Sequence, residues 1–177
     1  YVIELLNYQY GYIAWCIGNK RNKEAATYLD LAEKNLKTLS GNSRNLSLVN
    51  SYKAAFYGYR IGLNKLSAPF LGPKSVDCAR MAISSDSRNP LGYVQYANIQ
   101  FYMPAVFGGS KKEALEYYLK ALELMEQINN DLIENWNYLS LLTVIAQSYA
   151  YLDDYSSSVV YLEKALKTEP DFSWVKN

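Results

Sequence analysis

One stretch of the sequence decides the fold: LLTVIAQSYAYLDDYSSSVVYLEKALKTEP, which runs from Leu141 to Pro170. Apolar or small side chains recur in it at the spacing of one helix face. They form two stripes, at Leu142, Ile145, Ala146 and Tyr149 and then at Tyr155, Val159, Leu162, Ala165 and Leu166. Asp153-Asp154 separates the stripes, and Pro170 ends the second one. The stretch therefore predicts two helices joined by a tight turn.

The same helical periodicity extends over nearly the whole chain. There is no sustained alternation of period two, and the Gly and Pro residues fall between helical stretches rather than at hairpin spacing. We therefore expect an all-α fold with helices at residues 2–17, 23–39, 46–66, 75–84, 90–102, 111–128, 132–152 and 155–167.

Local signals support several of these boundaries. Asparagine before proline, at Asn89-Pro90, favours a helix start, because asparagine accepts from free amides and proline presets the first helical φ. Ser110 and Glu113 have the spacing of a capping box. The segment SAPFLGP at 67–73 is interpreted as a non-helical connector. Asn45 is the expected N-cap of the third helix.

Small residues recur at matching places in the four predicted helix pairs. Small side chains let antiparallel helices cross closely, so a shared spacing has a physical reason. In each pair the second helix carries two small residues seven positions apart. The sets are Ala14, Ala25 and Ala32, then Ala55, Ser75 and Ala82, then Ala97, Ala114 and Ala121, and finally Ala146, Ser158 and Ala165.

At these positions the sequence resembles the tetratricopeptide repeat (TPR) family. The stretch from Leu141 to Pro170 looks like one nearly complete repeat, and Glu113 to Leu124 is similar to the second helix of another. The resemblance implies an α-α superhelix of about four TPR-like helical hairpins with irregular inter-helix loops. We expect a single domain over 1–177, with repeats near 2–39, 46–84, 90–128 and 132–170 and the start of a C-terminal cap at 171–177.

The repeats are longer than the family standard of about 34 residues. Equivalent small residues lie 50, 39 and 44 positions apart. We expect the surplus in inter-helix loops, including 68–75 and 103–110. Three segments, APFLGPKS (68–75), FGGSKKEA (107–114) and EPDFSWVK (169–176), look like an uncharacterised group of exported bacterial TPR proteins. That likeness implies a periplasmic or secreted location, with a cytoplasmic one as the alternative. Because the sequence begins at Tyr1 and not at methionine, a signal peptide would not be visible in it, and its absence says nothing about location.

Composition and charge exclude several function classes. The chain has 177 residues, is 50% hydrophobic and has a formal net charge of +1, without the basic surplus of nucleic-acid-binding proteins. Because there is no histidine, Ser-His-Asp and Cys-His catalysis and histidine zinc sites are excluded. Cys16 and Cys78 are interpreted as small core residues. No run reaches the roughly 18 apolar residues of a membrane-spanning helix. We expect no enzymatic activity, cofactor, metal site or nucleic-acid partner.

In TPR proteins the first helix of each pair lines the concave face, where extended peptides dock. Carried over position by position, the resemblance implies a binding face of Trp15, Tyr52, Phe56, Tyr59, Arg60, Gln95, Asn98, Tyr102 and Gln147. Eighteen tyrosines fit a contact surface of this kind, although many of them are expected to be packing residues. Arg60 beside aromatic residues is suited to hold a carboxylate or phosphate; an ordinary surface arginine is the alternative.

Two functions are left open by the sequence. The first is a non-enzymatic protein–protein interaction module that binds a peptide segment or a subunit on the concave face. The alternative is a small-solute-binding accessory protein of a periplasmic transport system, in which the long loops at 68–75 and 103–110 would roof the groove into a pocket. We expect a monomer, with self-association as the alternative.

Overall fold

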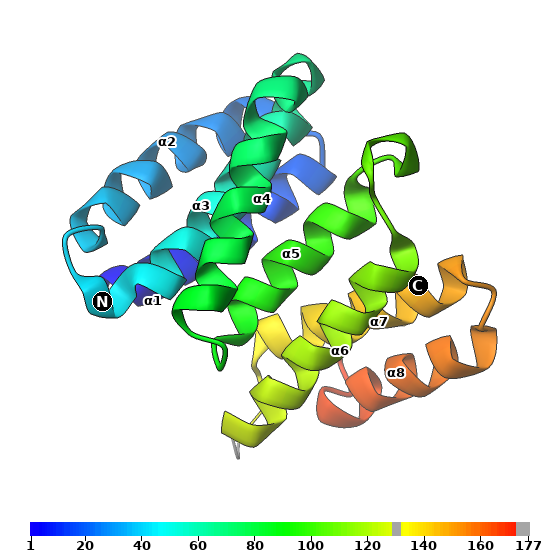
Figure 1. Cartoon of the computed structure of the whole chain (residues 1–177). Coiled ribbons are helices and arrows are strands. Elements are labelled where there is room, and N and C mark those ends of the chain that lie inside the picture. Colours follow the sequence, from blue (N-terminus) through cyan, green and yellow to red (C-terminus); the bar gives the residue numbers. More distant parts are fainter. Residues whose placement is uncertain (129–131, 173–177) are drawn as a thin grey trace. The chain divides into compact units, whose positions relative to one another are not determined.

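The computed structural model describes residues 1–128 and 132–172, and within them all regular structure is helical (Figure 1). This confirms the predicted all-α class. The α-helices are α1 (Val2–Gly18), α2 (Asn22–Leu39), α3 (Leu46–Leu63), α4 (Ala68–Ser85), α5 (Pro90–Tyr102), α6 (Lys111–Ile128), α7 (Trp136–Tyr151) and α8 (Tyr155–Thr168). Short 3₁₀ turns precede three of them: η1 (Ser43–Asn45), η2 (Lys65–Ser67) and η3 (Ala105–Phe107).

The chain forms two compact units, Tyr1–Gln95 and Tyr96–Asn177, called unit 1 and unit 2 below. The boundary falls inside α5. The helices pack as sequence-adjacent pairs, α1 with α2, α3 with α4 and α7 with α8, as a helical-repeat fold requires. The expectation of a single domain over 1–177 remains a prediction, and its proposed cap at 173–177 lies outside the described residues.

In unit 1 the core lies between α1, α2 and α3. Its members are apolar or aromatic and are fully or almost fully buried: Leu6, Ile13, Cys16, Ala25, Leu29, Ala32, Leu36, Val49, Tyr52, Ala55 and Phe56. Two buried serine hydroxyls join α4 to α3: Ser75 donates to the Ala54 carbonyl at 2.8 Å. Ser47 donates to the Ala82 carbonyl at 2.7 Å. The helices therefore approach closely enough for small side chains to bond directly to backbone.

Most of the small residues predicted to lie at helix crossings are buried. Ala25, Ala32, Ala55, Ser75, Ala82, Ala97, Ala114, Ala121, Ala146, Ser158 and Ala165 all fall in this class. Ala14 is the exception, because it is exposed on α1 while its neighbours Ile13 and Cys16 face the core. The first helix is therefore rotated by about one position from the register that the repeat spacing predicts.

The predicted connector at 67–73 is wrong, because α4 already begins at Ala68. Pro69 falls in the first turn, where backbone N–H groups have no helical partner to lose. Pro73 lies inside the helix. The residue before it is Gly72, which has no Cβ to clash with the proline ring. The loop proposed to roof a pocket at 68–75 is therefore a helix that packs on α3.

In unit 2 the second part of α5 packs on α6, and α7 packs on both α6 and α8. Ala114, Tyr118, Ala121, Leu142, Ile145 and Ala165 are buried there. The Glu126 carboxylate of α6 links three helices. It accepts from the Tyr138 hydroxyl of α7 at 2.8 Å and from the Lys164 ammonium of α8 at 2.6 Å. Burial, together with the bond to Glu126, raises the pKa of Tyr138. Burial alone would raise the pKa of Glu126, but the bonds from Lys164 and Tyr138 lower it.

The three predicted helix caps are formed to different degrees. Asn89 accepts from the Leu91 N–H at 3.1 Å, as expected for a helix start. Ser110 accepts from the Glu113 N–H at 3.1 Å, but the Ser110 N–H donates to the Gln100 carbonyl, and Glu113 accepts from Tyr96 instead. The capping box is therefore only half formed. Asn45 stands at the N-cap of α3 without a side-chain capping bond.

Candidate functional site

Two residues of the predicted concave face, Tyr52 and Phe56, belong to the core of unit 1. Their exposed fractions are 2% and 1%. Tyr10 of α1 lies against Tyr52 with ring centroids 6.0 Å apart, and Tyr52 stacks on Phe56 at 5.9 Å. The expectation that these rings face a partner is corrected: α1 and α3 pack side by side, and the aromatic face of α3 fills the space between them.

Tyr59 and Gln95 extend the same packed layer. The Tyr59 ring stacks on Tyr10 at 5.7 Å, and its hydroxyl donates to the Tyr10 carbonyl at 3.2 Å. The Gln95 amide donates to the Tyr10 hydroxyl at 3.1 Å, and Gln95 is buried. Gln95 is therefore also corrected from a partner contact to an interior hydrogen-bond donor, whereas Tyr59 stays half-buried.

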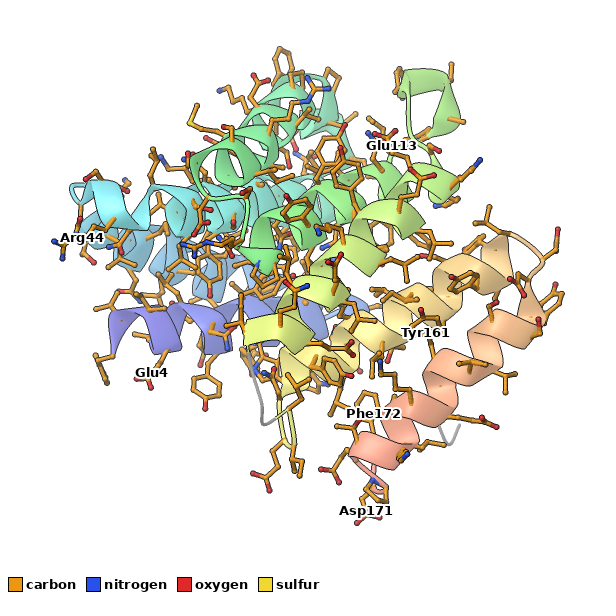
Figure 2. The ribbon with its side chains drawn as sticks, turned by 60° about the horizontal axis from the view of Figure 1, so that its bottom comes forward. Glu4, Arg44, Glu113, Tyr161, Asp171 and Phe172 are labelled. Atoms are coloured by element: carbon orange, nitrogen blue, oxygen red, sulfur yellow. The ribbon has the colours of Figure 1, made fainter. Side chains whose placement is uncertain are left out.

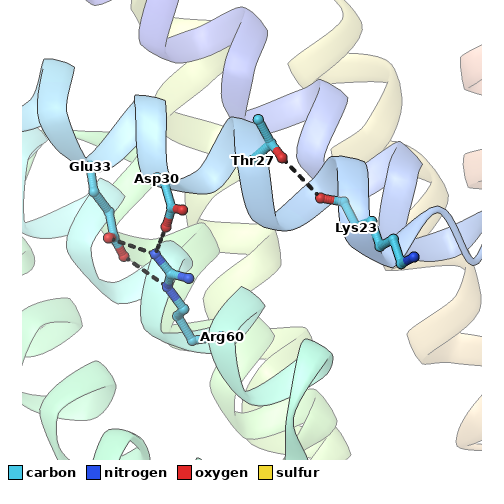
Figure 3. Close-up of polar contacts among 5 residues, drawn as sticks. All are labelled: Lys23, Thr27, Asp30, Glu33 and Arg60. Carbon is cyan, nitrogen blue, oxygen red and sulfur yellow. Dashed lines mark hydrogen bonds and ion pairs between the residues drawn. The ribbon is translucent and has the colours of Figure 1, made fainter.

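Arg60 holds carboxylates, as its position predicts, but they belong to α2 of the same unit (Figure 3). Its guanidinium bonds both oxygens of Glu33, at 3.2 and 2.8 Å, and Oδ1 of Asp30 at 2.5 Å. The bonds to Glu33 and Asp30 raise the pKa of Arg60 above its usual range, although burial opposes them. The arginine therefore joins α3 to α2.

We expect Arg60→Ala to lower the free energy of unfolding by about 1 kcal/mol, because the ion pairs are partly exposed and two carboxylates are left side by side. Urea unfolding followed by circular dichroism measures the change. Arg88→Ala removes an 87%-exposed arginine whose nitrogen lies 3.9 Å from Asp86, and serves as the control. Equal, negligible losses in both variants would show that the Arg60 ion pairs do not stabilise the contact between α2 and α3.

Trp15 lies in a surface cluster at the C-terminal end of α1. Its ring stacks on Tyr12 with centroids 5.8 Å apart, and the Arg21 guanidinium lies 5.1 Å from the Trp15 ring centroid. Glu24 pairs with Arg21 at 2.5 Å and accepts from the Tyr12 hydroxyl at 2.5 Å. The bond to Glu24 is the main cause that raises the pKa of Tyr12 to about 12. Trp15 remains accessible, with its ring held by neighbours.

Asn98, Tyr102 and Gln147 lie in unit 2. Asn98 accepts from the buried Tyr118 hydroxyl at 2.7 Å, so its side-chain oxygen is used within the fold. Tyr102, at the end of α5, is 69% exposed, and Gln147 is exposed on α7. That these three contact a partner stays a prediction.

Around Tyr102 the structure forms a cluster of Phe101, Tyr102, Lys111 and Tyr151, called the aromatic–lysine cluster below. The Phe101 ring lies edge-on to both tyrosines, with centroids 5.0 Å from Tyr102 and 5.3 Å from Tyr151. The Lys111 ammonium lies 3.8 Å from the Phe101 ring centroid and 5.1 Å from that of Tyr151. It also donates to the Phe101 carbonyl.

The cluster combines a fixed cation with two exposed rings. Phe101 is buried, whereas Tyr102 and Tyr151 are 69% and 59% exposed. Burial lowers the pKa of Lys111. Because Phe101 and Lys111 hold the tyrosines, their rings lose little freedom when another surface covers them. The arrangement is suited to contact an apolar or planar group of a partner.

Three of these four residues were missed by the sequence analysis. Tyr151 lies one turn after Gln147, so the helical spacing was a usable signal for it. Phe101 directly precedes Tyr102. It was missed because the predicted binding face took one residue from each turn of this helix, and Tyr102 was the one taken from the last turn. Lys111 carries no sequence signal, because its place over the rings depends on how the turn at 103–110 folds back.

The described residues contain no group of three potential metal-ligating side chains. Cys16 is buried, and Cys78 is half-buried with the pKa of its thiol raised by desolvation, so neither is an activated nucleophile. Over residues 1–128 and 132–172, no helix has the length and apolar character needed to cross a membrane.

Comparison with known proteins supports the repeat assignment. Residues 139–172 match the family model of the tetratricopeptide repeat, which confirms the resemblance for the last helix pair. The comparison with curated proteins found no match. The HusA haemophore from Porphyromonas gingivalis is similar in structure, with a TM-score of 0.66 and 22% identity over 81% of this chain and 72% of that chain. At this identity the likeness concerns the fold.

Proposed function

We propose that this chain, which carries a tetratricopeptide repeat at residues 139–172, is a non-enzymatic protein-interaction module. We further propose that the aromatic–lysine cluster of unit 2 contacts the partner. The observation that carries the proposal is the pair of exposed tyrosines, Tyr102 and Tyr151, held by Phe101 and Lys111 at the ends of α5 and α7.

The mechanism is burial of apolar surface on pre-positioned rings. A partner side chain that covers Tyr102 and Tyr151 removes both rings from water, and aromatic anchors of this kind carry much of the affinity of protein interfaces. Gln147 lies on α7 one turn before Tyr151, is exposed, and supplies an amide group for a hydrogen bond to the partner. The partner is a peptide segment or a subunit, and the module acts as a monomer in the periplasm or outside the cell.

The test is selection of binders from a displayed library of random peptides of about twelve residues, a length that spans an extended groove. The selected peptides are then titrated by fluorescence anisotropy. We expect Tyr102→Ala/Tyr151→Ala to weaken binding at least about thirtyfold, as loss of two anchors implies.

The control variant is Tyr8→Ala/Tyr155→Ala, which removes two tyrosines of similar exposure elsewhere. It is expected to bind as the unmodified chain does. Peptides that bind both variants and the unmodified chain equally would show that the cluster is not the contact surface.

A small-solute function is the second candidate, and the fold likeness to a haemophore is the observation that favours it. Because the chain has no histidine, an axial ligand for haem iron would have to be another side chain, such as a tyrosine, cysteine or methionine. Titration with haemin, followed by the Soret band, tests this reading. Saturable binding of one haemin per chain, lost in Tyr102→Ala/Tyr151→Ala, would favour the solute function over the interaction module.

A further inference from the structure

The formal charges of the chain are segregated between its two units. Residues 1–95 contain 12 lysines and arginines against 6 aspartates and glutamates, a net charge of +6. Residues 96–177 contain 6 against 11, a net charge of −5. The overall charge of +1 therefore conceals a basic unit 1. This raises the question of where on unit 1 the positive charge gathers.

One end of unit 1 combines positive charge with protruding apolar side chains. The α1–α2 turn and the α3–α4 turn lie at this same end, as Figure 1 shows, and Gly62 of α3 comes close to Ile17 of α1 there. This surface is called the basic end and consists of Trp15, Lys20, Arg21, Lys23, Lys65, Leu66 and Phe70.

The apolar members of the basic end are unusually exposed. Leu66, in the 3₁₀ turn η2, is 85% exposed, and Phe70, in the first turn of α4, is 75% exposed. They lie four residues apart, so they project from adjacent turns of the chain. Trp15, near the end of α1, is half-exposed, and the Arg21 guanidinium lies over its ring. A large exposed apolar pair rimmed by charge marks an interaction surface.

The charged members of the basic end are almost all positive. Over residues 18–24 and 64–70, Glu24 is the sole acidic residue of the sequence, and its carboxylate already bonds Arg21 and Tyr12. Lys20, Lys23 and Lys65 are exposed at the two turns. A cluster of this composition attracts an anionic surface. The attraction decays with distance over about one Debye length.

We infer that the basic end is a docking site for an anionic membrane surface, which goes beyond the proposed peptide-binding function and uses different residues. Leu66 and Phe70 enter the boundary between headgroups and acyl chains, while the lysines and Arg21 face the anionic headgroups. Trp15 suits the same interface, where its ring is partly apolar and partly polar. A nucleic acid would satisfy the charges but would leave the protruding apolar pair without a partner, whereas an anionic bilayer receives both.

Co-sedimentation with lipid vesicles tests the inference on the full chain. We expect binding to vesicles of phosphatidylcholine with about 30 mol % phosphatidylserine, and at least tenfold weaker binding to phosphatidylcholine alone. Raising the salt from about 0.05 M to about 0.5 M is expected to weaken binding by a further large factor, because exposed charges are screened.

Two variants with matched controls locate the site. Leu66→Ser/Phe70→Ser is expected to weaken vesicle binding about tenfold or more. Val106→Ser/Phe107→Ser changes an equally exposed apolar pair in unit 2 and is expected to bind normally. Lys23→Glu/Lys65→Glu is expected to abolish the preference for anionic lipid. The Lys37→Glu/Arg44→Glu variant makes the same change of charge at the other end of unit 1, where Figure 2 shows Arg44 and Glu4. This control is expected to keep the preference for anionic lipid.

The possible outcomes separate the inference from its competitors. No binding to anionic vesicles, equal binding to neutral ones, or equal losses in variants and controls would each overturn it. Tighter binding to polyglutamate or to an oligonucleotide than to the vesicles, lost in Lys23→Glu/Lys65→Glu but kept in Leu66→Ser/Phe70→Ser, would overturn the lipid assignment as well. Failure here leaves peptide binding at the aromatic–lysine cluster unaffected.

Discussion

Replacing Phe56 by alanine is expected to lower the free energy of unfolding by about 3 to 5 kcal/mol, the range for a buried phenylalanine. The ring is 1% exposed and contacts Tyr52 and Tyr59, with centroids 5.9 and 6.3 Å apart. Its removal leaves a cavity between α1 and α3 that a packed layer of aromatic rings refills poorly. Urea unfolding followed by circular dichroism measures the loss.

The matched control is Phe70→Ala, which removes the same side chain from a site that is 75% exposed. A change within about 0.5 kcal/mol is expected there, as for other surface substitutions. If Phe56→Ala lowered the free energy of unfolding as little as Phe70→Ala does, the Phe56 ring would lie on an open face. Phe56 would then be a residue of the concave binding face, as the sequence predicted, and not a core residue.

Replacing Gly109 by alanine is expected to lower the free energy of unfolding by about 2 to 3 kcal/mol. A Cβ at this position would lie 1.9 Å from the Met103 carbonyl oxygen and 2.6 Å from its carbonyl carbon. These are backbone atoms, so the turn at 103–110 must open to admit the methyl group. That opening would also displace Lys111, which immediately follows the turn, from the Phe101 and Tyr151 rings.

Gly58→Ala controls for the loss of glycine itself. Gly58 lies within α3, and a Cβ there meets nothing within 4 Å. Alanine is expected to be neutral or to stabilise the helix by up to about 1 kcal/mol. Thermal unfolding that gave Gly109→Ala the same midpoint as the unmodified chain would contradict the close approach of the turn to Met103.

The sequence predicted most helices well because their apolar stripes and stops are local. The bounds of α5 and α6 agree with the prediction, and those of α1, α2 and α8 differ by one residue at an end. The prediction failed at α4, where two prolines argued against a helix. Pro69 falls where its missing N–H costs nothing, and Gly72 relieves the crowding before Pro73. Packing on α3 then decides the conformation.

The candidate site was harder to predict because exposure depends on how neighbouring helices pack. The repeat pattern assigns both Tyr52 and Tyr102 to the concave face. In the structure, however, α1 covers Tyr52, while Tyr102 is exposed. Lys111 reaches the rings only because the turn at 103–110 folds back. The charge segregation, by contrast, was present in the sequence and was hidden by taking the net charge of the whole chain.

The measurement that tests the central claim most directly is a map of chemical-shift changes. The isotope-labelled chain is titrated with a library-selected peptide and followed by backbone and tyrosine-ring NMR spectra. The account predicts that the largest changes fall on Tyr102, Lys111 and Tyr151 and on their neighbours in α5 and α7. Changes confined to unit 1, with the Tyr102 and Tyr151 ring signals unmoved at saturation, would contradict it.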